Sequence, residues 1–85
     1  MRFTIDASAA TPPYEQLRVQ VRDAVAAGEL IAGAKLPTVR ALAEQLGLAV
    51  NTVARAYREL ETDRIIETRG RAGSFVAPQG DAVRR

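Results

Sequence analysis

The chain of 85 residues contains no cysteine and no histidine. These absences exclude disulfides, zinc ribbons, thiol nucleophiles and imidazole general bases together. No run approaches the roughly 18 apolar residues of a membrane span, and the N-terminal stretch MRFTIDASAATPP lacks the apolar centre of a secretory signal. The sequence therefore predicts no metal, no cofactor and no membrane partner, and a cytoplasmic location.

Charge is distributed unevenly, although the net charge is only +2. Residues 1–37 carry four basic and four acidic side chains, whereas residues 38–85 carry eight arginines against six acids. Eleven of the twelve basic residues are arginine, whose planar guanidinium suits phosphates and guanine edges. A GC-rich genome explains this arginine content equally well. The positions of the arginines therefore decide whether they indicate nucleic-acid binding.

Three segments show the apolar spacing of amphipathic helices. The first has Thr11 as a potential N-cap and Pro12 as its first position, and it ends at Gly28. After the turn-rich connector IAGAKLP, Thr38 is predicted to cap the second helix, VRALAEQLG, which ends at Gly47. The third helix, VNTVARAYRELETD, follows after only about three residues.

The third helix has two distinct faces at 100° per residue. Its apolar side is predicted to enter the core and holds Val53, Ala56, Tyr57 and Leu60. The opposite side, here called the outer face, holds Asn51, Ala54, Arg55 and Arg58. Its first two turns contain no acid, whereas an ordinary solvent face more often mixes acids with arginines to form ion pairs.

A β-hairpin is predicted after the third helix, because Ile65 and Ile66 precede a glycine-containing tip and the segment SFVA. Arg69 and Arg71 lie at its tip, and Phe75 is predicted to be a core residue. Residues 1–11 are predicted to form an arm or an edge strand, residues 12–77 the domain, and residues 78–85 a tail or the start of a linker.

Three helices followed by a hairpin, with a tight turn between the second and third helices, predict a mainly α fold with a β-hairpin, the winged helix-turn-helix. In this fold the third helix enters the major groove of DNA, and the hairpin contacts the backbone or the minor groove. A helix that enters a groove needs donors without bulk or negative charge, which is what the outer face offers. The carboxylates are scattered, and no serine has a base partner, so an enzyme is not expected.

The segments KLPTVRALAEQLGLAVNTVARAYRELE and RGRAGSFV resemble the DNA-binding domain of the GntR family of bacterial transcription regulators. The phrases PYEQL and NTVARAY are most similar to its YtrA-type members, and MocR-type members, in which an aminotransferase-like domain follows, share the second phrase. The resemblance covers about residues 12–77. It implies that Thr38 and Arg40 contact DNA at the start of the second helix.

The resemblance also places the start of the recognition helix at residues 49–52 and the wing tip at residues 70–73. With the arginines of the outer face and the hairpin, the predicted DNA-binding residues are Thr38, Arg40, Ala49, Val50, Asn51, Thr52, Arg55, Arg58, Arg69, Gly70, Arg71 and Gly73. Arg55 is preferred over Arg58, which lies deeper along the helix, and is expected to discriminate bases together with Asn51 and Thr52. Arg40 could instead be an ordinary solvated side chain, and Arg55 and Arg58 could be surface charges paired with nearby acids of the helix. Arg69 and Arg71 could serve only to keep the edge of the hairpin soluble.

Three residues depart from the pattern of the family. Ala49 replaces the usual capping residue, which costs about 1 kcal/mol unless the helix starts later, at Asn51 or Thr52. Val50 replaces a polar residue or proline, so contacts from it would be apolar, for example to a thymine methyl group. Arg64 replaces the glycine that commonly ends the third helix.

The sequence thus predicts a regulator, most often a repressor in families of this kind, that binds a palindromic operator in double-stranded DNA as a homodimer. One alternative is a winged-helix module that binds an acidic protein. Another is the N-terminal part of a longer regulator, including one linked to pyridoxal phosphate, in which a further domain senses a small-molecule effector. In that case the 85 residues would bind a single half-site weakly.

Overall fold

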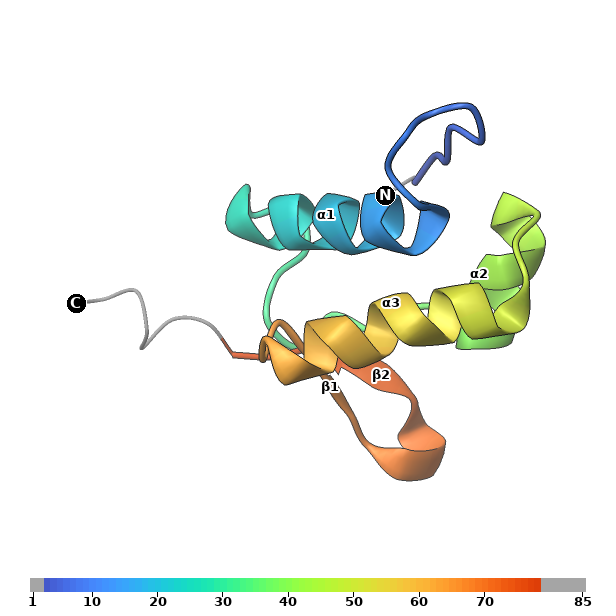
Figure 1. Cartoon of the computed structure of the whole chain (residues 1–85). Helices are drawn as coiled ribbons and strands as arrows, with labels where there is room; N and C mark the ends of the chain where they lie inside the picture. The colour runs from blue at the N-terminus through green and yellow to red at the C-terminus, as the bar shows by residue number, and fades with distance from the viewer. Residues whose placement is uncertain (1–2, 79–85) are drawn as a thin grey trace.

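A computed structural model of the chain describes residues 3–78. Three helices, α1 (Pro13–Ala26), α2 (Val39–Leu46) and α3 (Val50–Thr62), precede a hairpin of β1 (Ile66–Thr68) and β2 (Ser74–Val76). In Figure 1, α1 lies above α3, α2 lies beside the N-terminal end of α3, and the hairpin projects below it. The predicted mainly α fold with a wing is confirmed.

The core forms where the apolar faces of all the elements meet. On α3 the buried residues are the four that the helical period predicted, and Val53, Ala56 and Leu60 are 0% exposed. The other contributors come from α1, the connector, α2 and the hairpin: Leu17, Val21, Leu36, Leu42, Ala43, Ile66 and Val76. Helix α3 packs against both α1 and α2, so its outer face alone is left toward solvent.

Helix α1 begins one residue later than predicted and ends as a Schellman motif. Pro12 is its N-cap and Pro13 its first residue, and the helix has no side-chain cap, so Thr11 does not cap it. At the other end Gly28 adopts φ 81°, and its N–H donates to the carbonyl of Val25 while that of Glu29 donates to Ala24. Glycine therefore ends α1, as predicted.

The two helices of the helix-turn-helix are capped differently. Thr38 Oγ1 accepts a hydrogen bond of 3.0 Å from the N–H of Ala41, and Gly47 ends α2 at φ 69°, both as predicted. Helix α3 begins at Val50 with Ala49 as N-cap and has no side-chain cap. The alternative of a later start, at Asn51 or Thr52, is therefore wrong, because packing of the apolar face fixes the first turn without a cap.

The end of α3 is made by a residue that is not glycine. Arg64 adopts φ 62°, and its N–H donates to the carbonyl of Glu61 while that of Ile65 donates to Leu60. This is again a Schellman motif. The turn therefore has the left-handed residue that glycine usually supplies, although the residue here is an arginine. This conformation costs about 1–2 kcal/mol for a residue other than glycine.

The connector between α1 and α2 is more ordered than the sequence suggested. Lys35 forms an antiparallel bridge with Phe75, the N–H of Leu36 donates to Ser74, and that of Val76 donates to Ala34. Residues 34–36 therefore cover the second edge of β2. The prediction that Phe75 is a core residue is wrong: the side chain is half-buried on the face of the hairpin opposite Val76, because side chains alternate along a strand.

Residues 3–6 are held along α1 by two glutamines and form no strand. Gln20 accepts a hydrogen bond from the N–H of Thr4 and donates to its carbonyl, and Gln16 does the same for Asp6. The two amides are four residues apart on one face of α1. They replace a neighbouring strand, while Phe3 and Ile5 pack against the core.

Matched substitutions at the two N-caps test this account of α2 and α3. Ala49 has φ −67° and ψ 147°, the extended conformation that a capping serine needs. We expect Ala49→Ser to raise the free energy of unfolding by about 1 kcal/mol, and Thr38→Ala to lower it by about the same amount. Urea unfolding measures both, and no gain from the serine would contradict an uncapped start at Val50.

Tyr57 links α3 to the start of α2. Its ring is 5% exposed, its hydroxyl donates to the carbonyl of Pro37 at 2.6 Å, and burial raises its pKa to about 12. The folded chain therefore keeps a proton that the unfolded chain loses above about pH 10. The hydrogen bond from Tyr57 holds Pro37, and with it the residues that begin α2, against α3.

We expect the stability contributed by protonated Tyr57 to be complete below about pH 10 and to fall by about 1.4 kcal/mol per pH unit between pH 10 and 12. Urea unfolding from pH 8 to 11.5 measures this decline. Tyr57→Phe lacks the ionisable hydroxyl and should remove that part of the slope. An equal slope in the phenylalanine variant would show that another group is responsible.

Candidate nucleic-acid interface

The outer face of α3 is open and cationic. Asn51, Arg55 and Arg58 are exposed, and Ala54 between them is half-buried. The amide of Asn51 and the hydroxyl of Thr52 make no hydrogen bond within the described part of the chain, residues 3–78, so their polar groups are available to a ligand. Val50, at the leading end, is 49% exposed, one of two large apolar residues left in solvent within residues 3–78.

The arginines of the described chain differ in whether an acid accompanies them. Arg18, Arg22, Arg55 and Arg69 each lie within 4.0 Å of a carboxylate. Within residues 3–78, Arg40, Arg58 and Arg71 have no ion pair or side-chain hydrogen bond. These three lie at the start of α2, on α3 and at the wing tip.

Arg55 lies on the α1 edge of the outer face. Its guanidinium carbon is 3.9 Å from the centre of the Tyr14 ring, and its Nε is 4.0 Å from Glu59. The sequence raised pairing with a nearby acid as an alternative for this arginine, and Glu59 is that acid. Arg58, for which the same alternative was raised, has no such partner among the described residues.

The two arginines of the wing are held differently. Arg69 pairs with Glu67 on the outward face of the hairpin, and its guanidinium carbon is 4.7 Å from the ring centre of Phe75. Arg71 lies in the short 3-10 turn η1 (Gly70–Ala72) at the tip and is exposed. Of the two wing arginines, Arg71 is therefore the one without an acid partner among the described residues.

The wing is fixed to the end of α3 and to the connector. The Thr68 hydroxyl donates to the Glu61 carboxylate on α3. Gly73 has φ 108° and ψ −159°, a conformation essentially limited to glycine, and a Cβ there would lie 3.3 Å from the Lys35 side chain. Lys35 is an exposed cation beside the wing that sequence analysis missed, since only the pairing of the connector with β2 brings it there.

The start of α2 completes the surface. Thr38 and Arg40 are exposed, and Tyr57 ties the residue before Thr38 to α3. The hydroxyl of Thr38 is used as the cap, so Arg40 is the free polar group at this end. The two elements that pack beside α3, α2 and the wing, therefore each carry an exposed cation, Arg40 and Arg71.

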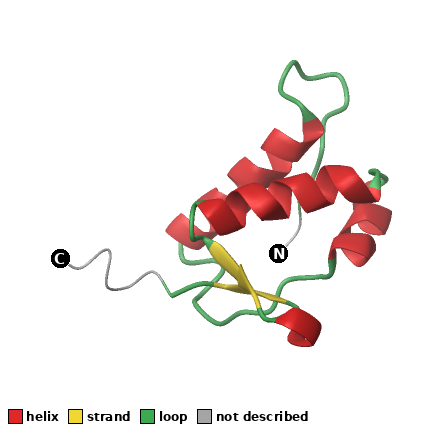
Figure 2. Cartoon of the chain, turned by 60° about the horizontal axis from the view of Figure 1, so that its bottom comes forward, coloured by secondary structure: helices red, strands yellow, loops and turns green. Residues whose placement is uncertain are grey.

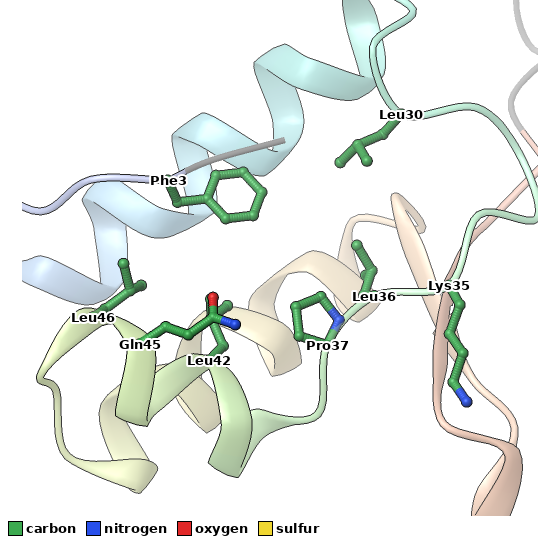
Figure 3. A pocket seen from close by; sticks show the side chains of 8 residues that line it. All are labelled: Phe3, Leu30, Lys35, Leu36, Pro37, Leu42, Gln45 and Leu46. Atoms are coloured by element: carbon green, nitrogen blue, oxygen red, sulfur yellow. The ribbon is translucent and has the colours of Figure 1, made fainter.

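A cavity of about 600 Å³, lined mostly by apolar side chains, lies elsewhere, between the N-terminal arm, the connector and α2. Figure 3 shows Phe3, Leu30 and Leu42 among the side chains around it, with Lys35 directed away. With Lys35 directed away, Gln45 is the polar side chain that remains at the wall of the cavity. One such side chain is too few to orient a small molecule. Among residues 3–78, no group of acids could hold a metal ion, and no helix is long and apolar enough to cross a membrane.

This fold and this surface define a winged helix-turn-helix DNA-binding domain. A crystal structure of AraR(DBD) in complex with operator ORX1 has the same fold, with a TM-score of 0.78 over 91% of this chain at 21% identity. The family model of the bacterial regulatory proteins, gntR family, matches residues 13–76. The chain belongs to the GntR family.

Individual relatives agree with this assignment. The chain is 60% identical over 73 residues to the HTH-type transcriptional regulator Rv1152 of Mycobacterium tuberculosis, covering 86% of this chain and 60% of the relative. It is 41% identical over 73 residues to the transcriptional repressor YtrA of Bacillus subtilis, covering 86% of this chain and 56% of the relative. A structure of YtrA from Sulfolobus acidocaldarius, 36% identical, has a TM-score of 0.83 over 98% of this chain and 68% of that one.

The resemblance predicted from the motifs is thus confirmed, and so is the prediction that this is not an enzyme, because the family is one of transcription regulators. The matched segment covers 60% of the length of Rv1152 and 56% of that of the Bacillus subtilis YtrA. The part of such a regulator that this chain represents is the DNA-binding domain.

Proposed function

We propose that the chain binds double-stranded DNA sequence-specifically through the outer face of α3, the start of α2 and the wing. The observation that carries this proposal is the placement of Arg40, Arg58 and Arg71. They have no acid partner among the described residues, and they lie on α2, on α3 and at the wing tip, where both α2 and the hairpin strand β1 pack against α3. An unpaired guanidinium can release counterions from the phosphate backbone without first breaking an ion pair.

The contacts divide into those that position the domain and those that read the bases. Phosphates are contacted from the start of α2 and from the wing, by Thr38, Arg40, Arg69, Gly70, Arg71 and Gly73. Asn51 and Thr52 supply hydrogen bonds to base edges, with Arg58 beside them. Ala49 and Val50 bring the leading turn of α3 close to the groove floor, where the Val50 side chain suits a thymine methyl group. Arg55 also belongs to the proposed DNA-binding residues and lies on the α1 edge of the outer face.

The regulator is proposed to act as a repressor on a palindromic operator, as a homodimer with one recognition helix in each half-site, about one helical turn apart. The names of the relatives support the first part, since the Bacillus subtilis YtrA is called a repressor. The AraR structure contains an operator, which supports binding of the same kind by this fold. Such a protein acts in the cytoplasm, and an effector is expected only if a further domain exists.

Replacing Arg40 with alanine tests the proposed surface. A binding site is first selected from random duplexes, and affinity for it and for an unrelated duplex is then measured between 50 and 300 mM salt. We expect Arg40→Ala to weaken both complexes by the same factor and to reduce the salt slope by about one unit. Removing a phosphate contact weakens all sequences alike, because every duplex carries the same backbone.

Arg22→Ala is the matched control, since Arg22 is an exposed arginine of α1 that pairs with its neighbour Asp23. It should leave the affinity and the slope unchanged. A loss confined to the selected sequence would contradict the role of Arg40, and failure of the unsubstituted chain to bind any duplex would contradict the proposed function.

A further inference from the structure

Arg55 is oriented by an aromatic ring from another helix. Its guanidinium carbon is 3.9 Å from the centre of the Tyr14 ring, within the range of a cation–π contact. The separation of 4.0 Å between its Nε and Glu59 is too long for a hydrogen bond. The arginine side chain is still 56% exposed, and a stacked guanidinium keeps the N–H donors of its rim free.

The ring of Tyr14 and the wing lie on opposite edges of the recognition helix. On one edge Arg55 meets Tyr14 of α1, and on the other Glu61 accepts a hydrogen bond from Thr68 of β1. Figures 1 and 2 show the same arrangement, with α1 and the hairpin on either side of α3. Arg55 and the wing therefore lie on opposite edges of the outer face of α3.

A helix in the major groove meets the phosphates of both strands. The groove is about 12 Å wide and a helix with its side chains is about 10–12 Å across, so side chains on the two edges reach the two walls. If the wing follows the backbone of one strand, the opposite edge faces the backbone of the other strand. Base edges, in contrast, lie at the groove floor, under the centre of the outer face.

We propose that Arg55 contacts a phosphate of the strand opposite the wing, and that Tyr14 is the positioning residue that holds its guanidinium there. This inference rests on the proposed function, and it gives Arg55 a role in affinity and register rather than in base discrimination. Stacking restricts the rotamers of the arginine before DNA arrives, so less conformational freedom is lost on binding. The Glu59 carboxylate beside it opposes the phosphate, since like charges repel.

The test uses the 85-residue chain, fluorescence anisotropy with the selected duplex and an unrelated duplex, and salt from 50 to 300 mM. Arg55→Ala should reduce the salt slope by about 0.9 on both duplexes, without changing the preference between them. Tyr14→Phe keeps the ring and should behave as the unsubstituted chain, whereas Tyr14→Leu should lose part of the same slope. Glu59→Gln should tighten binding to both duplexes.

A neutral methylphosphonate, moved along the strand opposite the wing, locates the contact. At one position it should weaken the unsubstituted chain and leave Arg55→Ala unaffected. A thermal melt of each variant shows that it is folded, and Arg55→Ala with the methylphosphonate series decides the matter even if Tyr14→Leu unfolds the chain. An unsubstituted chain that binds no duplex defeats the proposed function before any variant is compared.

Three results would overturn the inference while leaving DNA binding intact. Arg55→Ala could change the preferred base at one position with the salt slope unchanged, which would make Arg55 a base reader. It could leave both affinity and slope unchanged, which would show that the arginine makes no contact. Folded Tyr14→Leu could keep the full slope that Arg55→Ala loses, which would remove the positioning role of the ring.

Discussion

Replacing Leu60 with alanine is expected to destabilise the chain by about 3–5 kcal/mol and to weaken DNA binding by raising the fraction of unfolded chain. Leu60 is 0% exposed and lies on the core side of α3. The neighbouring elements are fixed by their own packing, so the space left by the isobutyl group closes only in part. A domain of 85 residues has a free energy of unfolding of about 4–13 kcal/mol, so this substitution removes a large part of it.

Arg58 provides the matched variant, because it lies two residues before Leu60 on the opposite side of the same helix and is exposed. Arg58→Ala should change the free energy of unfolding by less than about 0.5 kcal/mol and should still weaken binding to duplex DNA. Urea unfolding and anisotropy separate the two effects. Comparable stability losses from the two substitutions would contradict the two-faced description of α3.

Asn51→Ala is expected to reduce discrimination at one base pair of the selected site by about 1–3 kcal/mol, a loss of roughly 5- to 150-fold, with little change in non-specific affinity. Asn51 is exposed in the first turn of α3. An asparagine amide fits the N6 and N7 groups of adenine with two hydrogen bonds, and alanine offers neither.

A library of duplexes with single substitutions measures this effect. Asn51→Ala should flatten the preference at one A·T pair and leave the other positions as they were. Thr62→Ala is the control, because the Thr62 hydroxyl at the far end of α3 donates to the carbonyl of Arg58 and offers no donor to bases. An equal loss for every duplex would instead place Asn51 against the phosphate backbone.

The helices and the wing could be predicted because local rules decide them. The apolar period of α3 identifies all four of its buried residues, and the N-cap Thr38 and the stop at Gly47 follow directly from side-chain and backbone chemistry. Where tertiary packing competes with a local rule, the rule fails. Ala49 does not delay the start of α3, and Arg64 takes the left-handed conformation that glycine usually supplies.

The contacts that orient the site side chains could not be predicted, since they join segments that are distant in sequence. Tyr14 and Arg55 lie on different helices, and no spacing rule brings them together. The pairing of the connector with β2, which places Lys35 beside the wing and leaves Phe75 outside the core, is of the same kind. The sequence identified which arginines to consider, and within residues 3–78 the structure separates Arg55 and Arg69, which lie beside acids, from Arg40, Arg58 and Arg71, which do not.

The most direct test of the proposed surface is a titration of the chain with the selected duplex, followed by backbone amide chemical shifts. The largest changes should occur at Arg40, Asn51, Arg58 and Gly70, which come from three separate elements, while the core residues Val21 and Ala24 of α1 stay constant. Changes concentrated around the arm and the cavity, with the outer face of α3 unaffected, would contradict the account.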